Sequence, residues 1–318
     1  MLKTPVCDVL GIEHPIVQGS FGPWTNAELP AAVSNAGGLG SVGLVLMDVE
    51  RVRTLIRRVR ELTDKPFAVN FTARPLVEEV FAAALTESPA VVSHALGDPG
   101  DLVERAHDVG AVFVQQVHTV DQSRRAQERG VDVIIAQGFD AGGFGGQVGA
   151  LTLLPQVVDA VAPLPVLAAG GIADGRGLAA ALLLGAQGAN IGTRFLASVE
   201  AGIDESWKRR IVEGSSEDAV RIERPDELFG PGPESGYAVA PRVLRTPFVE
   251  AWNAGGADAE QSREELMDAL PEGRAHELIP FTGQSAGLIE EVLPVAEIVR
   301  RLVADAEAAL RAAPTIAG

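Results

Sequence analysis

Short apolar runs alternate with helical patterns over the first two-thirds of the chain, and this alternation constrains the fold more than any other feature. The runs have the length of strands, are rich in Val, Ile and Ala, and show little polar alternation. Such runs are typical of parallel strands buried on both faces. They predict strands at Ile16–Gln18, Leu39–Val45, Phe67–Asn70, Ala90–Ser93, Ala111–Val117, Val133–Gln137, Pro165–Ala169 and Ala189–Gly192.

Helical patterns separate these runs and carry start and stop signals. Asp48 stands where an N-cap is expected, and Gly110 and Gly130 follow helical segments as left-handed C-caps. The predicted helices are Asn26–Asn35, Asp48–Leu62, Val77–Thr86, Asp101–Val109, Val120–Arg129, Leu153–Val161 and Gly177–Leu184. Eight similarly spaced strands with intervening helices favour a closed (β/α)₈ TIM barrel.

The alternative is a doubly wound sheet that binds a dinucleotide. Residues 38–43, GLGSVG, fit the G-x-G-x-x-G pattern of that fold. They follow a helix and lead into a strand, whereas the dinucleotide fingerprint needs the reverse order. We therefore interpret these glycines as a helix end and a closely packed strand.

The alternation weakens after Gly192. Residues 203–283 are more polar and rich in loops, with helices predicted at Asp204–Glu213 and Gln261–Leu270. A further helix is predicted over Ile289–Arg311. We predict a barrel over residues 1–202, completed by a C-terminal helix within 284–312, and an appended helical subdomain over 203–283.

Composition limits the partners that the chain can bind. The formal net charge is −17, which repels nucleic-acid phosphates and anionic lipid surfaces. The single cysteine, Cys7, excludes an internal disulfide and a metal site built from several cysteines. No signal peptide or membrane-spanning run is evident. We expect a soluble cytoplasmic protein that acts on a small molecule.

Uncharged amides end several of the predicted strands, at the end of a (β/α)₈ barrel where active sites lie. They are Gln18, which Gly19 follows, Asn70 and Gln137. Amides donate and accept hydrogen bonds, which suits a planar heterocycle, whereas a metal would need clustered carboxylates or imidazoles. Each amide could alternatively be a satisfied core group.

Glycines follow the last two strands, in the loops that bind phosphate in barrels of this type. Gly170 and Gly171 follow the seventh strand, and Gly192 and Thr193 follow the eighth. Their backbone N–H groups could surround an anion, with the Thr193 hydroxyl as a further donor. An amide-lined ring pocket beside a phosphate site fits FMN best.

Other polar residues near strand ends have less defined roles. The loop 142–149 is rich in glycine and could be a lid or a close approach to a ring. Asp140 could act at the reaction centre or stabilise its loop. His94 and His118 fall at strand ends, where either could face a pocket.

These motifs together resemble the nitronate monooxygenase (2-nitropropane dioxygenase) family of FMN-dependent barrels, which is related to the FMN-dependent enoyl-ACP reductases. The resemblance rests on segments PIVQG (15–19), PFAVN (66–70), AQG (136–138), AGG (141–143), AAGGI (168–172), GTRF (192–195) and GQSAGLI (283–289). It implies that FMN is held by Gln18, Asn70, Gln137, Gly138, Gly171, Gly192, Thr193 and the segment around Gln284, near Gly142 and Gly143.

One departure bears on the chemistry. The family places a histidine, which serves as base or hydrogen-bond donor, directly after the two glycines, where this chain has Phe144. Phenylalanine transfers no proton, so we expect oxidation of preformed alkyl nitronates with O₂ rather than of neutral nitroalkanes. His118 could supply the missing imidazole, and Arg74 and Arg194 are candidates for attracting an anionic substrate.

Two other functions stay open. One is an NAD(P)H-dependent flavin reductase that acts on quinones or enoyl thioesters, because hydride transfer needs no histidine. The other is a flavin-binding protein without catalysis, in which Phe144 fills the pocket.

Overall fold

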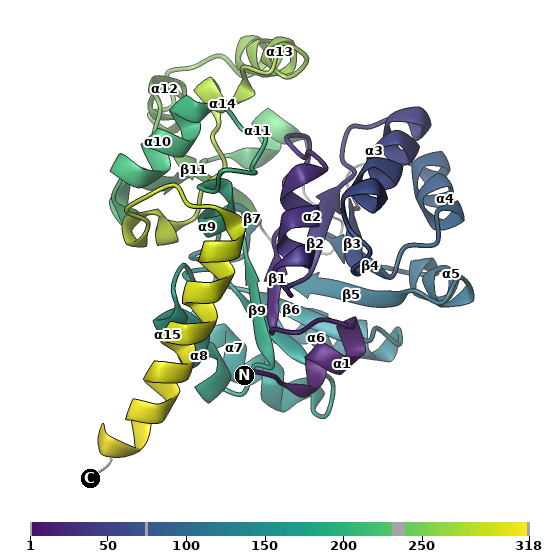
Figure 1. The fold of residues 1–318 in the computed structure, drawn as a ribbon. Coiled ribbons are helices and arrows are strands. Elements are labelled where there is room, and N and C mark those ends of the chain that lie inside the picture. Colours follow the sequence, from purple (N-terminus) through teal and green to yellow (C-terminus); the bar gives the residue numbers. More distant parts are fainter. Residues whose placement is uncertain (1, 74–75, 231–238, 317–318) are drawn as a thin grey trace.

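A barrel of eight parallel strands forms the centre of the protein (Figure 1). The computed structural model describes residues 2–73, 76–230 and 239–316. Around the barrel the strands follow the order β1-β9-β8-β6-β5-β4-β3-β2. Their bounds are β1 Ile16–Gln18, β2 Gly40–Gly43, β3 Phe67–Thr72, β4 Val91–Ala95, β5 Val112–Val117, β6 Val133–Gln137, β8 Val166–Ala169 and β9 Gly188–Ile191.

The barrel closes between β1 and β2. Val17 forms a parallel bridge with Leu39, just before β2. The Gln18 N–H donates to the Leu39 carbonyl at 2.9 Å, and the Leu39 N–H donates to the Ile16 carbonyl at 2.9 Å. The predicted (β/α)₈ barrel is therefore confirmed, with every predicted strand in place and only the ends shifted.

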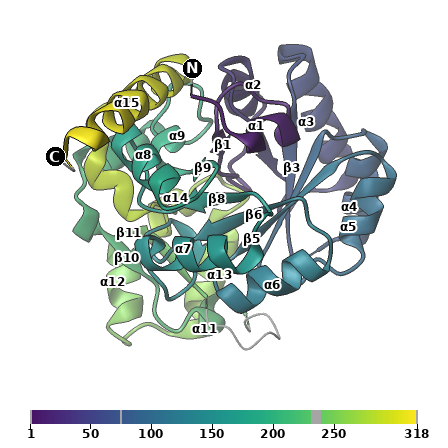
Figure 2. The same cartoon turned by 90° about the horizontal axis from the view of Figure 1, so that it is seen from below.

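Helices surround the strands (Figure 2). Their bounds are α2 Glu28–Asn35, α3 Val49–Leu62, α4 Glu78–Thr86, α5 Leu102–Asp108, α6 Val120–Glu128, α7 Ala150–Val161 and α8 Gly175–Leu183. Helix α3 illustrates why they form. The Asp48 side chain caps it by accepting the Arg51 N–H, and Val52, Ile56 and Val59 are buried on one face.

The interior of the barrel has its own apolar core. Val17, Ala68, Val114 and Leu167 belong to one buried cluster with residues of the N-terminal helix α1 (Pro5–Leu10). This cluster is distinct from the larger core between strands and outer helices. Helix α1 thus lies at the end of the barrel interior, and the opposite end is left for the loops that follow the strands.

The glycines of residues 38–43 serve packing. A side chain at Gly40 would place its Cβ 1.9 Å from the Pro30 carbonyl oxygen of α2, and one at Gly43 would meet the Gly22 nitrogen at 2.6 Å. Their order is helix α2 and then strand β2. The interpretation as a packed strand is therefore confirmed, and no dinucleotide fingerprint is present here.

The region after β9 contains more than the predicted helices. A small antiparallel sheet joins β10 (Ala219–Arg221), β11 (Ala240–Leu244) and β7 (Gly143–Gly145), which no apolar pattern had indicated. The helices here are α9 Thr193–Leu196, α10 Glu205–Glu213, α11 Pro225–Phe229, α12 Pro247–Asn253, α13 Ala259–Ala269 and α14 Ala275–Leu278, with the 3₁₀ helices η1 Ser216–Asp218 and η2 Gln284–Leu288.

The chain ends in helix α15 (Val295–Ile316), which packs against α8 and α2 (Figure 1). It begins six residues later than the predicted start at Ile289, because η2 and an extended segment precede it. The boundaries 1–202, 203–283 and 284–312 stay a prediction. Among the described residues, no helix is long and apolar enough to cross a membrane.

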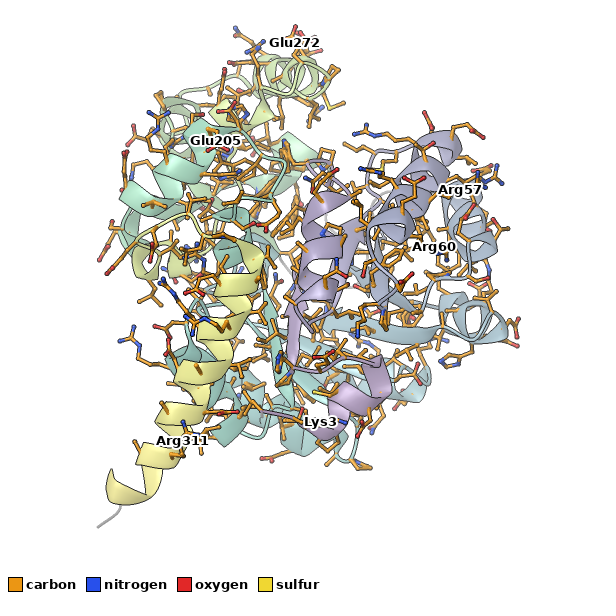
Figure 3. The ribbon with its side chains drawn as sticks, in the orientation of Figure 1. Lys3, Arg57, Arg60, Glu205, Glu272 and Arg311 are labelled. Atoms are coloured by element: carbon orange, nitrogen blue, oxygen red, sulfur yellow. The ribbon has the colours of Figure 1, made fainter. Side chains whose placement is uncertain are left out.

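Most charged side chains of the described helices lie on their outer faces, whereas Arg194 of α9 and Lys208 of α10 are buried. Figure 3 labels six exposed ones, with Arg57 and Arg60 on α3, Glu205 on α10, Arg311 on α15, and Lys3 and Glu272 in loops. Many form exposed ion pairs such as Lys3–Asp8 and Arg58–Glu61. Exposed pairs of this kind each contribute little stability.

Candidate active site

A cavity of about 270 Å³ opens where the barrel strands end and extends toward the barrel interior. Its volume is close to the lower end of the range for small-molecule sites. Most residues predicted to bind the cofactor line it: Gln18, Gly19, Asn70, Gln137, Gly142, Gly143, Gly170, Gly171, Gly192 and Thr193. Phe144 lines it as well. Gly138, Asp140, His118 and Gln284 do not.

The cavity wall is electrically neutral. Among the described residues that line it, none is Asp, Glu, Lys, Arg, His, Cys or Tyr. Its polar groups are amides, hydroxyls and backbone atoms. In the described part of the chain, no cluster of three His, Cys, Asp or Glu side chains could hold a metal ion. The wall can therefore offer hydrogen bonds, but no side chain that exchanges a proton near neutral pH.

Gln18 is bound to the neighbouring strand. Its Nε2 donates to the Ser41 carbonyl at 3.1 Å, and its Oε1 accepts the Ser41 N–H at 3.0 Å. These two hydrogen bonds reinforce the closure of the barrel. Gln18 therefore matches the alternative prediction, in which the amide is a hydrogen-bonded group of the core. The Gly19 N–H likewise donates to the Ile191 carbonyl at 2.8 Å.

Asn70 and Gln116 leave acceptors toward the cavity. The Asn70 Nδ2 donates to the Ser93 hydroxyl at 2.7 Å, and the Gln116 Nε2 donates to the Gln137 Oε1 at 3.1 Å. Asn70 Oδ1 and Gln116 Oε1 have no donor among the described residues. Both side chains line the cavity, so these oxygens can accept hydrogen bonds from a planar ring. Sequence reasoning missed Gln116, since it lies one residue before the end of its strand.

His118 lies behind the cavity wall. The imidazole is buried, and its Nε2 is 2.7 Å from the Gln137 Oε1. It also forms a hydrogen bond with the backbone of Phe144. His118 is therefore placed to orient Gln137 and strand β7 rather than to contact a ligand in the cavity. His94 is also buried, and its Nδ1 is 3.0 Å from the Gln115 Oε1.

The two buried histidines predict a loss of stability in mild acid. Burial lowers the pKa of His118 and of His94 below the usual value near 6.5. At a pH below about 6.5 the two histidines therefore bind protons in the unfolded chain but not in the folded chain. The free energy of unfolding falls as the pH drops through this range. Each histidine contributes a slope of up to about 1.4 kcal/mol per pH unit.

Urea denaturation between pH 7.5 and 5 measures this slope, and a His94→Asn variant should show a shallower one. Stability that is unchanged or higher at pH 5 would contradict the neutral state of these imidazoles.

Backbone N–H groups gather at the rim where β8 and β9 end. Gly170 and Gly171 have φ of +100° and +72°, a left-handed geometry that favours glycine. The N–H groups of Gly171 and Gly192 have no acceptor within the described ranges. A Cβ at Gly192 would meet only the Phe21 ring edge, at 3.7 Å. Free donors and open space fit a phosphate group. The Asp140 carboxyl carbon lies 3.9 Å from the position of a Cβ added at Gly171, and Asp140 Oδ2 accepts the Ala150 N–H.

The segment around Gln284 folds back over this rim. The Gly283 N–H donates to the Thr193 Oγ1 at 2.9 Å, which leaves the hydroxyl proton of Thr193 to donate elsewhere. The Gln284 N–H donates to the Asp140 carbonyl at 3.0 Å. A Cβ at Gly142 would lie 2.6 Å from the Gly283 nitrogen, so the two backbones touch. Ser285, rather than the Gln284 side chain, reaches the cavity wall.

The loop after β6 is fixed from outside the cavity. Asp140 Oδ2 accepts the Ala150 N–H at 2.9 Å, at the start of α7, so this carboxylate stabilises its loop. A Cβ at Gly138 would lie 2.4 Å from the Ala150 backbone, which makes Gly138 a packing glycine. Arg242 donates to the Phe139 carbonyl at 3.0 Å, and Arg221 donates to the Gly145 carbonyl at 2.9 Å.

Aromatic side chains form one wall of the cavity. The Phe144 ring lies 5.9 Å from Phe281 and 5.3 Å from Phe229. Trp24 lies 5.5 Å from Phe281 and 5.3 Å from Trp207. Apart from Phe144, sequence reasoning missed this wall, because its members come from distant segments without a shared periodicity. The wall gives the neutral cavity one apolar side.

The sequence offered two arginines, Arg74 and Arg194, as candidates for attracting an anionic substrate. Arg74 lies outside the described residues. Arg194 is buried, does not line the cavity, and donates to the Ala197 and Glu291 carbonyls. Direct contact between Arg194 and a substrate is therefore excluded in this arrangement.

A sequence model of the nitronate monooxygenase family matches residues 3–84 and 72–305, which is most of the chain. The chain belongs to the nitronate monooxygenase family. Its predicted membership is thus confirmed, and the family is one of oxidoreductases whose membership implies a flavin cofactor.

Relatives in the nitronate monooxygenase family carry different activities in their names. The nitronate monooxygenase of Pseudomonas aeruginosa is 32% identical over 93% of this chain and 97% of its own. The (3aS,4S,5R,7aS)-5-hydroxy-7a-methyl-1-oxo-octahydro-1H-indene-4-carboxyl-CoA dehydrogenase of Mycobacterium tuberculosis is 37% identical over 80% of this chain and 69% of its own.

Solved structures agree with the fold and the family. FabK of Thermotoga maritima matches with a TM-score of 0.91 and 34% identity over 99% of this chain and 100% of its own. A nitroalkane oxidase of Streptomyces ansochromogenes matches with a TM-score of 0.81 and 27% identity over 96% of this chain and 99% of its own. The predicted relation to FabK-type enoyl-ACP reductases is therefore also confirmed.

Proposed function

We propose that the chain is an FMN-dependent oxidoreductase that oxidises alkyl nitronates with O₂ and uses no protein base. The observation that carries this proposal is the neutral cavity wall, which has no titratable side chain among its described residues. A nitronate has already lost the carbon-bound proton that a nitroalkane must give up. Its oxidation therefore needs no group that the cavity lacks.

The rim and the amides support FMN as the flavin. The free N–H groups of Gly171 and Gly192, with the Thr193 hydroxyl, would hold a terminal phosphate. Asn70 Oδ1 and Gln116 Oε1 would accept hydrogen bonds from N–H groups of the ring. When bound, a flavin supplies redox chemistry with organic donors and O₂ that side chains cannot.

The protein contributes orientation and exclusion of water. Gln137 is held by His118 and Gln116, so its amide keeps one orientation beside the cavity. The aromatic wall of Trp24, Phe144 and Phe281 covers one side with apolar surface. This wall suits the alkyl part of a nitronate, and the polar side suits its oxygens.

A second candidate is hydride transfer between NAD(P)H or a thioester and the flavin. The same neutral wall favours hydride transfer, because moving a hydride to or from a carbon atom needs no side chain that accepts a proton. The M. tuberculosis relative is named for a CoA thioester substrate, and the similarity to FabK points in the same direction. Quinones or enoyl thioesters would then be the acceptors.

Anaerobic mixing of the flavin-loaded protein with each donor distinguishes these functions. We expect nitroethane in its nitronate form to bleach the flavin at least about tenfold faster than neutral nitroethane, since only the neutral form needs a base. Equal rates would contradict the proposal. Rapid bleaching by NADPH would favour the second candidate, and no bleaching by any donor would indicate flavin binding without catalysis.

A further inference from the structure

Arg194 is a buried cation two residues after Gly192, in the segment that carries part of the proposed phosphate site. It follows Thr193 directly and lies in the short helix α9, yet only 7% of it is exposed. Its Nη2 donates to the Ala197 carbonyl at 2.5 Å and to the Glu291 carbonyl at 2.7 Å. The guanidinium therefore links the turn after β9 to the segment before α15.

The charge of Arg194 has no carboxylate partner in the described part of the chain. The Glu291 carboxylate attracts the Arg194 guanidinium without an ion pair between them, and it is paired with Arg301 at 2.7 Å. The Arg194 Nε is buried and has no acceptor. Burial lowers the pKa of Arg194 to about 10, so the group is still protonated at neutral pH.

A buried, unpaired cation is unfavourable unless an anion compensates it. Among the described residues, Arg194 hydrogen-bonds only to neutral carbonyls, and the Glu291 carboxylate that attracts it through space is offset by Arg301. The proposed flavin phosphate would bring a negative charge to the adjacent turn, where the N–H groups of Gly171 and Gly192 are free. In a poorly solvated region such a charge is felt without direct contact.

We infer that Arg194 is a positioning residue for the flavin phosphate: its buried charge favours an anion at the Gly171–Gly192 rim, and its two hydrogen bonds hold the turn that carries Thr193. The inference rests on the proposed flavin function. Arg194 would thus favour a phosphorylated flavin although its side chain does not line the cavity.

Binding of FMN and of riboflavin, which lacks the phosphate, tests this role. Flavin-free protein is titrated and the quenching of flavin fluorescence is measured. We expect Arg194→Met to raise the Kd for FMN about tenfold and to leave the Kd for riboflavin within about twofold. Arg194→Lys keeps the charge and should retain most of the preference for FMN.

Two further variants keep the test decisive. Arg58→Met removes an exposed charge from α3, where Arg58 pairs with Glu61, and should leave both Kd values unchanged. If Arg194→Met does not fold, Arg194→Gln replaces it, since glutamine keeps an N–H donor for the two carbonyls without the charge.

The outcomes separate this inference from the proposed function. Equal weakening of FMN and riboflavin would show that Arg194 only supports the fold, and unchanged affinities would also overturn the inference. If the unaltered protein binds neither flavin, the proposed function fails as well. If it binds FMN and the variant keeps the same preference over riboflavin, only the role of Arg194 fails.

Discussion

Replacing Phe144 by histidine should enable the protein to take electrons from neutral nitroalkanes. Phe144 lines the cavity from β7, at the position where the family resemblance places a histidine. An imidazole there would be the first proton acceptor among the described lining residues. General base catalysis typically contributes 10²–10⁴-fold, so we expect flavin reduction by neutral nitroethane to accelerate about 100-fold or more.

A matched variant distinguishes the effect of the added base from the effect of the lost ring packing. Phe144→Leu also removes the ring contacts with Phe281 and Phe229 but supplies no imidazole. It should leave nitroethane as slow as in the unaltered protein, whereas reduction by the nitronate should change only a few-fold in both variants. Equal nitroethane rates in the histidine and leucine variants would contradict the assignment of Phe144 to the reaction side of the cavity.

A single methyl group at Gly192 should abolish most of the affinity for FMN. Gly192 has φ of −100°, so alanine adds no left-handed strain, and its Cβ would meet only Phe21, at 3.7 Å. The fold should therefore tolerate Gly192→Ala. The methyl group would occupy the rim where the phosphate is proposed to approach the backbone, and we expect the Kd for FMN to rise about 100-fold.

Gly149 offers a close control for this substitution. It also precedes a helix, has φ of −62°, and has no atom within 4 Å of an added Cβ, but it does not line the cavity. Gly149→Ala should bind FMN as the unaltered protein does, and both variants should keep their melting temperature within a few degrees. Similar Kd values for the two variants would place the phosphate elsewhere.

The barrel could be predicted from sequence because its strands are buried on both faces. Residues 133–136 of β6 form a continuous apolar run, so the burial of this strand leaves a local signal. Strands β7 and β10 are three residues long and contain Gly or Arg. Their pairing with β11 depends on contacts between distant segments, which no local periodicity reveals.

Site residues could be predicted from the sequence where they lie near the end of a recognisable strand. Asn70 and Gln137 reach the cavity for that reason. Gly138 looked equivalent to Gly142 in sequence, and only the approach of Ala150 identifies it as a packing glycine. Phe281 lies far from the barrel strands in the sequence and is brought to the aromatic wall by an antiparallel bridge with Val243. Its position in the wall can therefore be seen only in the folded structure.

The flavin content of the purified protein tests the central claim most directly. The visible absorption spectrum is recorded, and any flavin released by heating is identified by its mass and quantified against protein. A yellow protein that releases about one FMN per chain, or a colourless one that takes up FMN when it is supplied, is the predicted result. A protein that contains no flavin and fails to bind added FMN would contradict the account.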